Sequence, residues 1–92
     1  MIYKKHYVYL VECRDKTFYI GYTVDLEKRI KVHNQGNGAK YTRGRRPVKL
    51  LYYEEFQDKG HALRREMALK KLTRKQKKKL IGLEWFNESS LW

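Results

Sequence analysis

Two short apolar runs separated by a polar turn limit what this chain can fold into more than any other feature. The runs cover residues 7–12 (YVYLVE) and 17–22 (TFYIGY), and both are rich in β-branched and aromatic residues. Such a pair predicts a β-hairpin. Because side chains alternate across a strand, Tyr9 has a defined face on the first strand, and Tyr19 and Gly21 share a face of the second. The two tyrosines lie on the same side of the hairpin if the register brings these faces together.

The rest of the chain predicts helices alternating with one further strand. Hydrophobic spacing, capping residues and a Gly-rich segment place the elements in this order: a helix at about 24–35, a mobile basic loop at 36–47, a strand at 48–56, a helix from Asp58 to about Leu72, and a helix at 74–83.

The length of the chain, 92 residues, leaves room for one domain. We predict that this domain covers residues 1–83 and that a tail follows at 84–92. The tail contains two tryptophans and no basic residue. It either docks on an apolar patch or is loosely ordered.

The net charge of the chain is strongly positive. Lys and Arg number 22 against 10 Asp and Glu, which gives a formal charge of +12 and predicts a polyanionic partner. Nucleic acid is favoured over a membrane, because the basic residues are interleaved with aromatic ones and no segment pairs an apolar face with a uniformly basic one. No run is apolar enough for a secretory signal or a membrane span, so we expect a cytoplasmic protein. The single cysteine, Cys13, is expected to be an inert core residue.

A carboxylate lies within the apolar face that the second helix is predicted to bury. At 100° per residue, Glu66 falls near the middle of a face that consists of Ala62, Leu63, Met67 and Leu69. A buried carboxylate has to be paired, protonated or bound to a cation. Two interpretations remain open at this point: an ion pair with Lys70 one turn later, or a metal ligand that holds Mg²⁺ or Mn²⁺ together with water and a substrate phosphate.

The order of these motifs resembles the GIY-YIG nuclease superfamily, in particular its small single-domain bacterial branch. The matching segments are YVY at 7–9, YIG at 19–21 and TVDLEKRIKVHN at 23–34, followed by Glu66 in a helix after the third strand. The resemblance covers roughly residues 5–83, and Tyr7 stands where the motif that names the family has glycine. It implies an α/β (α+β) fold with a three-stranded antiparallel sheet flanked by helices, which agrees with the elements predicted above.

The resemblance also implies functional residues and a reaction. It places Tyr9, Tyr19, Arg29 and His33 in a catalytic site and makes Glu66 the ligand of one Mg²⁺ or Mn²⁺ ion. The implied reaction is endonucleolytic hydrolysis of phosphodiesters, with DNA undergoing repair or recombination as the expected substrate. Tyr9 orients or deprotonates the attacking water, Arg29 neutralises charge on the phosphate, and Tyr19 and His33 position water and phosphate.

Two clusters of basic residues are expected to bind the phosphates of that nucleic acid. They are Lys40, Arg43, Arg45 and Arg46 in the loop, and Arg74, Lys75, Lys77, Lys78 and Lys79 in the last helix. The main alternative function is a nucleic-acid-binding module of the same fold whose catalysis is weak or lost. A basic scaffolding protein is a third class, in which nothing requires Glu66 or Tyr9.

Overall fold

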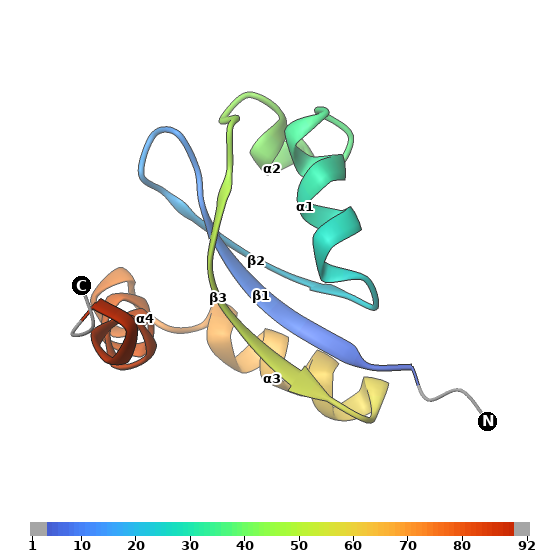
Figure 1. The fold of residues 1–92 in the computed structure, drawn as a ribbon, viewed down its shortest axis with the longest axis vertical. Helices are drawn as coiled ribbons and strands as arrows, with labels where there is room; N and C mark the ends of the chain where they lie inside the picture. The colour runs from blue at the N-terminus through green and yellow to red at the C-terminus, as the bar shows by residue number, and fades with distance from the viewer. Residues whose placement is uncertain (1–3, 90–92) are drawn as a thin grey trace.

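The chain folds around a three-stranded antiparallel sheet. A computed structural model describes the backbone of residues 4–89 and the side chains of residues 4–82. The elements follow in the order β1 (His6–Glu12), β2 (Phe18–Thr23), α1 (Leu26–Asn34), α2 (Lys40–Arg43), β3 (Lys49–Phe56), α3 (Lys59–Lys70) and α4 (Arg74–Ser89) (Figure 1). This confirms the predicted sheet flanked by helices.

The register of the hairpin places the two motif tyrosines on one face of the sheet. The strand order is β2-β1-β3, so β1 is central and pairs with both neighbours in an antiparallel direction. On β2, Gly21 lies opposite Tyr9, and Tyr19 lies opposite Val11. Tyr9 and Tyr19 are therefore diagonal neighbours with ring centroids 6.4 Å apart, as the strand alternation predicts.

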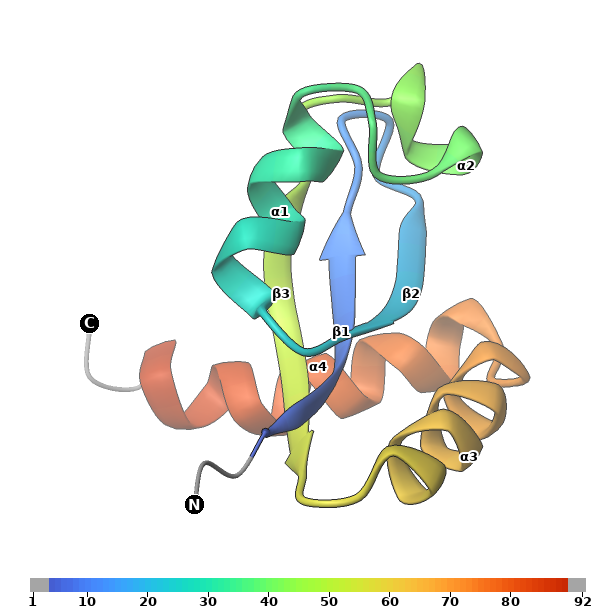
Figure 2. The same ribbon diagram turned by 90° about the vertical axis from the view of Figure 1, so that its right-hand side faces the viewer.

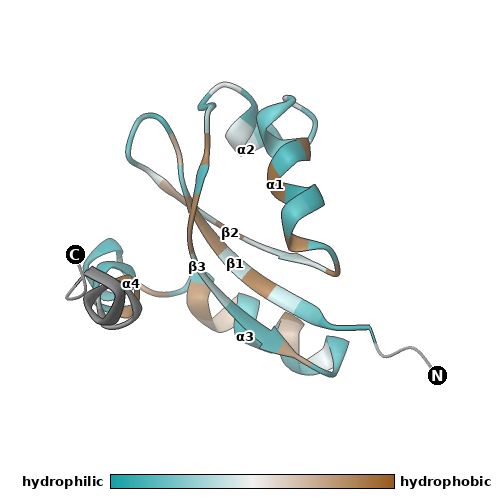
Figure 3. Ribbon diagram, in the orientation of Figure 1, coloured by the Kyte–Doolittle hydropathy of each residue, from teal (hydrophilic) through white to brown (hydrophobic). Residues whose placement is uncertain are grey.

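Helices cover both faces of the sheet, and each face has its own core. On one face, Val8 and Leu10 of β1 pack with Ala62 and Leu69 of α3. On the opposite face, the core consists of Tyr9, Val11, Cys13 and Val48, with Leu26 and Ile30 of α1 packed against it. The ribbon shows α1 and α2 on one side of the strands and α3 on the other (Figures 1 and 2). The brown, apolar segments of α1 and α3 lie toward the strands (Figure 3).

Side-chain caps set the helix starts. The Asp25 carboxylate accepts from the backbone N–H of Lys28, so α1 begins at Leu26, two residues later than predicted. Asp58 caps α3 in the same way through the N–H of His61. Before α4, Thr73 and Gln76 accept from each other's backbone N–H, which is a capping box.

Two further predictions differ from the structure. The segment at 36–47 is not one irregular loop, because it contains the short helix α2, whose Thr42 is buried. The last helix was expected to end at 83, but α4 continues to Ser89, since no proline or glycine follows Gly82 to stop it. Residues 90–92 of the predicted tail, and the side chains that would dock it, lie outside the described part of the structure. Within residues 4–89, no helix has the length and apolar character to cross a membrane.

Candidate active site

A chain of buried hydrogen bonds joins the central strand to α1 and α2. Tyr9 Oη lies 2.7 Å from His33 Nε2, and His33 Nδ1 lies 2.8 Å from Thr42 Oγ1. The Thr42 hydroxyl donates to the carbonyl of Ala39 at 3.2 Å. All three side chains are at most 1% exposed, so these bonds are shielded from competing water.

The direction of each hydrogen bond assigns the protons of this chain. The Thr42 hydroxyl uses its one proton toward Ala39, so its oxygen accepts from Nδ1–H of His33. His33 Nε2 is then the acceptor, and the Tyr9 hydroxyl donates to it. In the neutral imidazole that burial favours, the acceptor nitrogen is turned toward Tyr9.

Arg29 adds a positive charge at the other end of the chain. Its Nε donates to Tyr9 Oη at 3.4 Å, and its Nη2 donates to the carbonyl of Gly38 at 2.6 Å. Both acceptors are uncharged, so these contacts orient the half-buried guanidinium without neutralising it. An oriented arginine that keeps its charge is suited to bind a phosphate.

Burial and Arg29 set the protonation states. Burial raises the pKa of Tyr9, although Arg29 acts in the opposite direction. Burial and the nearby Arg29 charge lower the pKa of His33 from 6.5 to about 4. At neutral pH the phenol is therefore protonated and the imidazole uncharged, in agreement with the hydrogen-bond directions.

Two glycines make room for the buried pair. A Cβ at Gly21 would lie 2.3 Å from Tyr9 Oη, and a Cβ at Gly38 would lie 2.3 Å from His33 Nδ1. Real Cβ atoms do not approach other atoms so closely. The Tyr9 ring can therefore lie over β2 only because position 21 has no side chain, and the His33 ring needs the same at position 38.

Tyr19 extends this site into an aromatic cluster. Its ring lies at 5.4 Å from the His33 ring in an edge-on arrangement, and it stacks on Tyr41 of α2 at 5.9 Å. Arg45 in turn lies over the Tyr41 ring, 4.0 Å from its centroid. The four predicted residues Tyr9, Tyr19, Arg29 and His33 thus lie together, whereas Tyr41 was not predicted.

The surroundings of Glu66 differ from the helical-wheel prediction. Leu63 and Met67 are 37% and 60% exposed, so the buried face of α3 consists of Ala62 and Leu69 instead. Glu66 follows Ala62 by one turn on this narrower face, and its side chain is 17% exposed. The predicted ion pair is present, with Lys70 Nζ 3.3 Å from Glu66 Oε2. The Glu66 carboxylate also raises the pKa of Tyr9, which places the two groups within electrostatic reach.

One carboxylate is available for a cation at this site. Among the described residues, no group of three or more His, Cys, Asp or Glu side chains could hold a metal ion. A shielded single oxygen donor fits Mg²⁺ or Mn²⁺, because these hard ions keep several waters and complete their shell with substrate phosphate. The donor set does not fit Zn²⁺, which needs three or four protein ligands.

The basic residues of the loop differ in their contacts, and Arg46, like Arg45, donates to a backbone carbonyl, that of Arg43 at 2.9 Å. Arg45 is engaged in the fold, since it pairs with Asp15 at 3.1 Å and donates to the carbonyl of Tyr41 at 2.7 Å. Arg43 and Arg46 line a hollow of about 440 Å³ together with Arg14, a residue of the hairpin turn. Lys40 is exposed at the start of α2.

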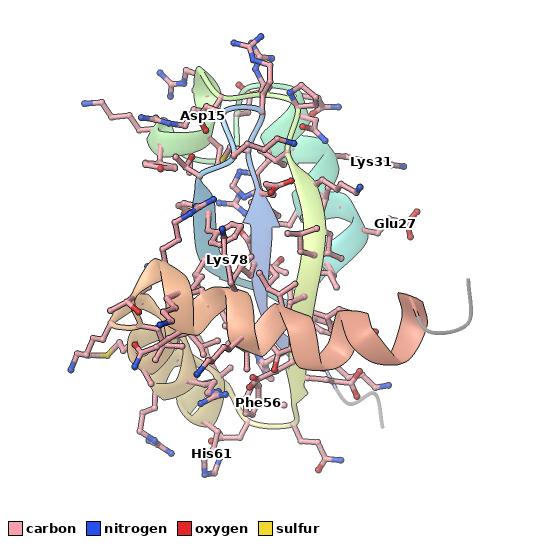
Figure 4. All side chains as sticks on the ribbon, turned by 90° about the vertical axis from the view of Figure 1, so that its left-hand side faces the viewer. Asp15, Glu27, Lys31, Phe56, His61 and Lys78 are labelled. Carbon is pink, nitrogen blue, oxygen red and sulfur yellow. The ribbon has the colours of Figure 1, made fainter. Side chains whose placement is uncertain are left out.

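The basic residues of α4 also differ in their environment. Lys75, Lys78 and Lys79 are exposed, and Arg74 lies over the Phe18 ring at 4.5 Å. Lys77 lines a second hollow beside the aromatic cluster. In Figure 4, Lys78 projects from α4, whereas Glu27 and Lys31 point outward from α1.

Sequence reasoning missed three residues of the site. Thr42, Gly38 and Tyr41 all lie in the segment predicted as a loop, where no periodicity indicates which side chains turn inward. The only signal was composition: two glycines in close succession and a tyrosine between basic residues.

The comparison with known families shows to which family the chain belongs. A model of the GIY-YIG catalytic domain matches residues 5–79, which include Tyr9, Tyr19, Arg29, His33 and Glu66. The chain belongs to the GIY-YIG family. The match covers most of the chain and ends within α4, close to the extent estimated from the motifs.

Relatives within the GIY-YIG family are similar over nearly their whole length. A UPF0213 protein of Clostridium perfringens is 54% identical over 85 residues, covering 92% of this chain and 91% of the relative. The UPF0213 protein YazA of Bacillus subtilis is 53% identical over 76 residues, covering 83% of this chain and 77% of the relative. These names state no activity.

Solved structures of similar chains have the same fold. The solution structure of a UPF0213 protein from Bacillus halodurans is 48% identical, with a TM-score of 0.57 over 86% of this chain and 84% of the other. A protein from E. faecalis, also solved in solution, is 48% identical, with a TM-score of 0.60 over 91% of this chain and 88% of the other.

Proposed function

We propose that this GIY-YIG protein is a metal-dependent endonuclease that hydrolyses phosphodiesters of nucleic acid, with DNA as its substrate. The observation that carries the proposal is the buried hydrogen-bond chain from Arg29 through Tyr9 and His33 to Thr42. The Tyr9 hydroxyl lies between a positively charged donor, Arg29, and a neutral imidazole, His33, and this arrangement can move a proton.

Arg29 binds the scissile phosphate in this proposal. Its guanidinium is half-buried and hydrogen-bonded only to uncharged oxygens, so it can turn toward a non-bridging phosphate oxygen. Tyr9 is 1% exposed, and Arg29 Nε is 3.4 Å from its hydroxyl. Turning of the guanidinium toward the phosphate gives a water molecule access to that hydroxyl.

The Tyr9–His33 pair accepts the proton of the attacking water. The water oxygen bonds to phosphorus as the bond to the leaving 3′ oxygen breaks. Tyr9 Oη takes the proton that the water loses, and its own proton passes to His33 Nε2, so the phenol remains neutral. The leaving oxygen takes a proton from solvent, and His33 later returns its proton through Tyr9. A bound phosphate offsets the charge of Arg29, one cause of the low pKa of His33, and so favours this transfer.

Glu66 is the residue that would hold the divalent ion. A bound Mg²⁺ or Mn²⁺ supplies positive charge that polarises the phosphate and stabilises the leaving oxygen. The carboxylate must first be released from Lys70, which neutralises it in this structure. The net charge of +12 supports a polyanionic substrate.

One observation favours the second candidate, a nucleic-acid-binding module with weak or lost catalysis. The ion pair with Lys70 gives Glu66 a partner without any metal, and burial holds Tyr9 in its protonated form. In such a module the same chain of hydrogen bonds would only hold Arg29 in place for phosphate binding.

Cleavage of labelled DNA separates the two candidates. Duplex, nicked, flapped and branched DNA, and RNA of the same sequence, are incubated with Mg²⁺ or Mn²⁺. We expect Tyr9→Phe and Glu66→Gln each to lower the cleavage rate by at least about 100-fold, the usual effect of losing a general base or charge stabilisation. Tyr53→Phe and Glu55→Gln are matched controls on exposed positions of β3 and should cleave like the wild type.

The binding curves complete this test. Wild-type protein that binds the substrates in a salt-sensitive manner but never cuts them would overturn the proposed nuclease and favour the binding module. Cleavage that persists undiminished in Glu66→Gln would show that this carboxylate does not hold the metal.

A further inference from the structure

A hollow lined by lysines and aromatic side chains adjoins the candidate active site. It has a volume of about 240 Å³ and is lined by Phe18, Tyr19, Ile20, Tyr41, Lys70 and Lys77. These residues come from β2, α2, α3 and α4, so four elements converge on it. Both charged groups in the lining are positive.

Two of the lining residues also contact residues of the candidate active site. Tyr19 contacts the His33 ring and also lines the hollow. Lys70 lines the hollow, and its Nζ lies 3.3 Å from Glu66 Oε2. The hollow therefore adjoins the site where the scissile phosphate is expected, and Lys70 both lines the hollow and pairs with the carboxylate.

We propose that this hollow binds the phosphodiester neighbouring the scissile one, and that Lys70 couples this binding to occupation of Glu66 by the metal ion. This inference rests on the proposed function, because it takes Glu66 as the metal ligand. Lys70 and Lys77 bind the phosphate oxygens, while Phe18, Tyr19, Ile20 and Tyr41 form a wall for the sugar and base.

The coupling follows from the two partners that Lys70 can have. Without nucleic acid, its ammonium group pairs with Glu66 and competes with a divalent cation for the carboxylate. Its side chain is 52% exposed and has a flexible stem, so it can turn toward a phosphate in the hollow. A phosphate that attracts Lys70 releases Glu66, and a cation that occupies Glu66 releases Lys70. Each ligand then raises the affinity for the other by the same factor.

The neighbouring lysines provide matched variants. Lys77 lines the hollow but is not the partner of Glu66, and Lys71 is exposed and absent from the lining. Replacement of each by methionine removes one charge while keeping a long, flexible side chain. Lys71→Met therefore measures the general effect of one lost charge on metal and nucleic-acid affinity.

Binding of Mn²⁺ is measured by electron paramagnetic resonance, with and without a short phosphorothioate oligodeoxynucleotide whose linkages stay charged and resist hydrolysis. In wild type, we expect the oligonucleotide to raise Mn²⁺ affinity at least about fivefold, the lower end of typical coupling. Lys70→Met should bind Mn²⁺ at least about threefold more tightly without oligonucleotide, and its coupling should fall below about twofold. Lys77→Met should weaken oligonucleotide binding and leave Mn²⁺ affinity without oligonucleotide unchanged.

The result for Glu66→Gln separates failure of this inference from failure of the proposed function. If Glu66→Gln binds Mn²⁺ as well as the wild type, the metal site itself is wrong. Suppose instead that Mn²⁺ binding needs Glu66, but that Lys70→Met matches Lys71→Met both in Mn²⁺ affinity without oligonucleotide and in the increase that the oligonucleotide causes. The coupling is then overturned, while the metal site stands. Oligonucleotide affinity that is unchanged in Lys77→Met relative to Lys71→Met would overturn the phosphate site in the hollow.

Discussion

The side chain of Tyr9 is held in place by three neighbouring residues. Its ring lies over Gly21 of β2, its hydroxyl donates to His33, and Arg29 of α1 donates to the hydroxyl oxygen. A tyrosine held on several sides cannot change its rotamer without breaking buried contacts. Substitutions around it should therefore affect both stability and cleavage.

Gly21→Ala should destabilise the protein through this close approach. The new Cβ would lie 2.5 Å from Tyr9 Cζ, and the ring has no free direction in which to move. We expect the free energy of unfolding in urea to fall by about 1–3 kcal/mol, as for other overpacked sites. Gly44→Ala is the control, since its Cβ would meet nothing within 4 Å. Equal stabilities of the two variants would show that position 21 tolerates a side chain.

His33 should make folding stability depend on pH. Its pKa is about 4 in the folded protein and 6.5 when exposed, so the unfolded chain takes up the proton first as the pH falls. The stabilisation is fully present above about pH 6.5 and is lost toward pH 4, with a total of about 3 kcal/mol. Urea unfolding between pH 7 and pH 4 should show this fall in wild type and in His61→Gln. His33→Gln should lack this component, and an identical pH profile in that variant would contradict the assignment.

The short helix α2 shows how an element can serve one site. Four residues cannot form a stable helix by themselves. This one is held by Thr42, which bonds to His33 and Ala39, and by Arg45, which bonds to the carbonyl of Tyr41. The helix in turn brings Tyr41 onto Tyr19. Segment 36–47 thus completes the site instead of only linking α1 to β3.

Replacing Thr42 tests this link between α2 and α1. Thr42→Val keeps the shape but removes the acceptor of His33 Nδ1–H, which leaves a buried donor unsatisfied. We expect a loss of about 1–3 kcal/mol in unfolding free energy and a slower cleavage rate. Thr42→Ser keeps the hydroxyl and should restore the cleavage rate of the wild type. Nitrogen NMR of the His33 ring should report a change of tautomer population in Thr42→Val alone, and its absence would refute the proton assignment.

At the scale of the whole molecule, charge is distributed unevenly over the surface. Three arginines line the hollow near α2, and Lys77 of α4 lines the hollow beside the aromatic cluster. A nucleic acid bound across this surface would contact both groups through its phosphates, which fixes its position without reading its bases.

The salt dependence of DNA binding should identify which surface makes these contacts. For duplex DNA, each lost phosphate contact lowers the slope of log affinity against log salt by about 0.9. Lys77→Gln combined with Lys78→Gln should therefore reduce the slope by up to about 1.8. Lys28→Gln with Lys31→Gln removes the same charge from exposed positions of α1, where Lys31 points outward (Figure 4). A slope reduced equally by both pairs would mean that only net charge matters.

The sequence determined the parts of this protein that depend on local periodicity. Alternation in the two strand segments assigned Tyr9 and Tyr19 to one face each, which the observed register brings together, and the 3.6-residue period predicted the helix that carries Arg29 and His33. Motif order then identified the family. The side chains buried by α3 were predicted only in part, because Leu63 and Met67 are apolar yet exposed, and a helical wheel cannot show where a neighbouring element ends.

Only the tertiary structure decided how these residues act together. The bonds from His33 to Tyr9 and to Thr42 join residues 24 and 9 positions apart, and they depend on how a nonperiodic segment returns to α1. The hollow beside Lys70 likewise depends on where α2 and α4 meet β2. No periodic signal encodes such contacts, because they arise from the packing of whole elements and not from the spacing of residues within one.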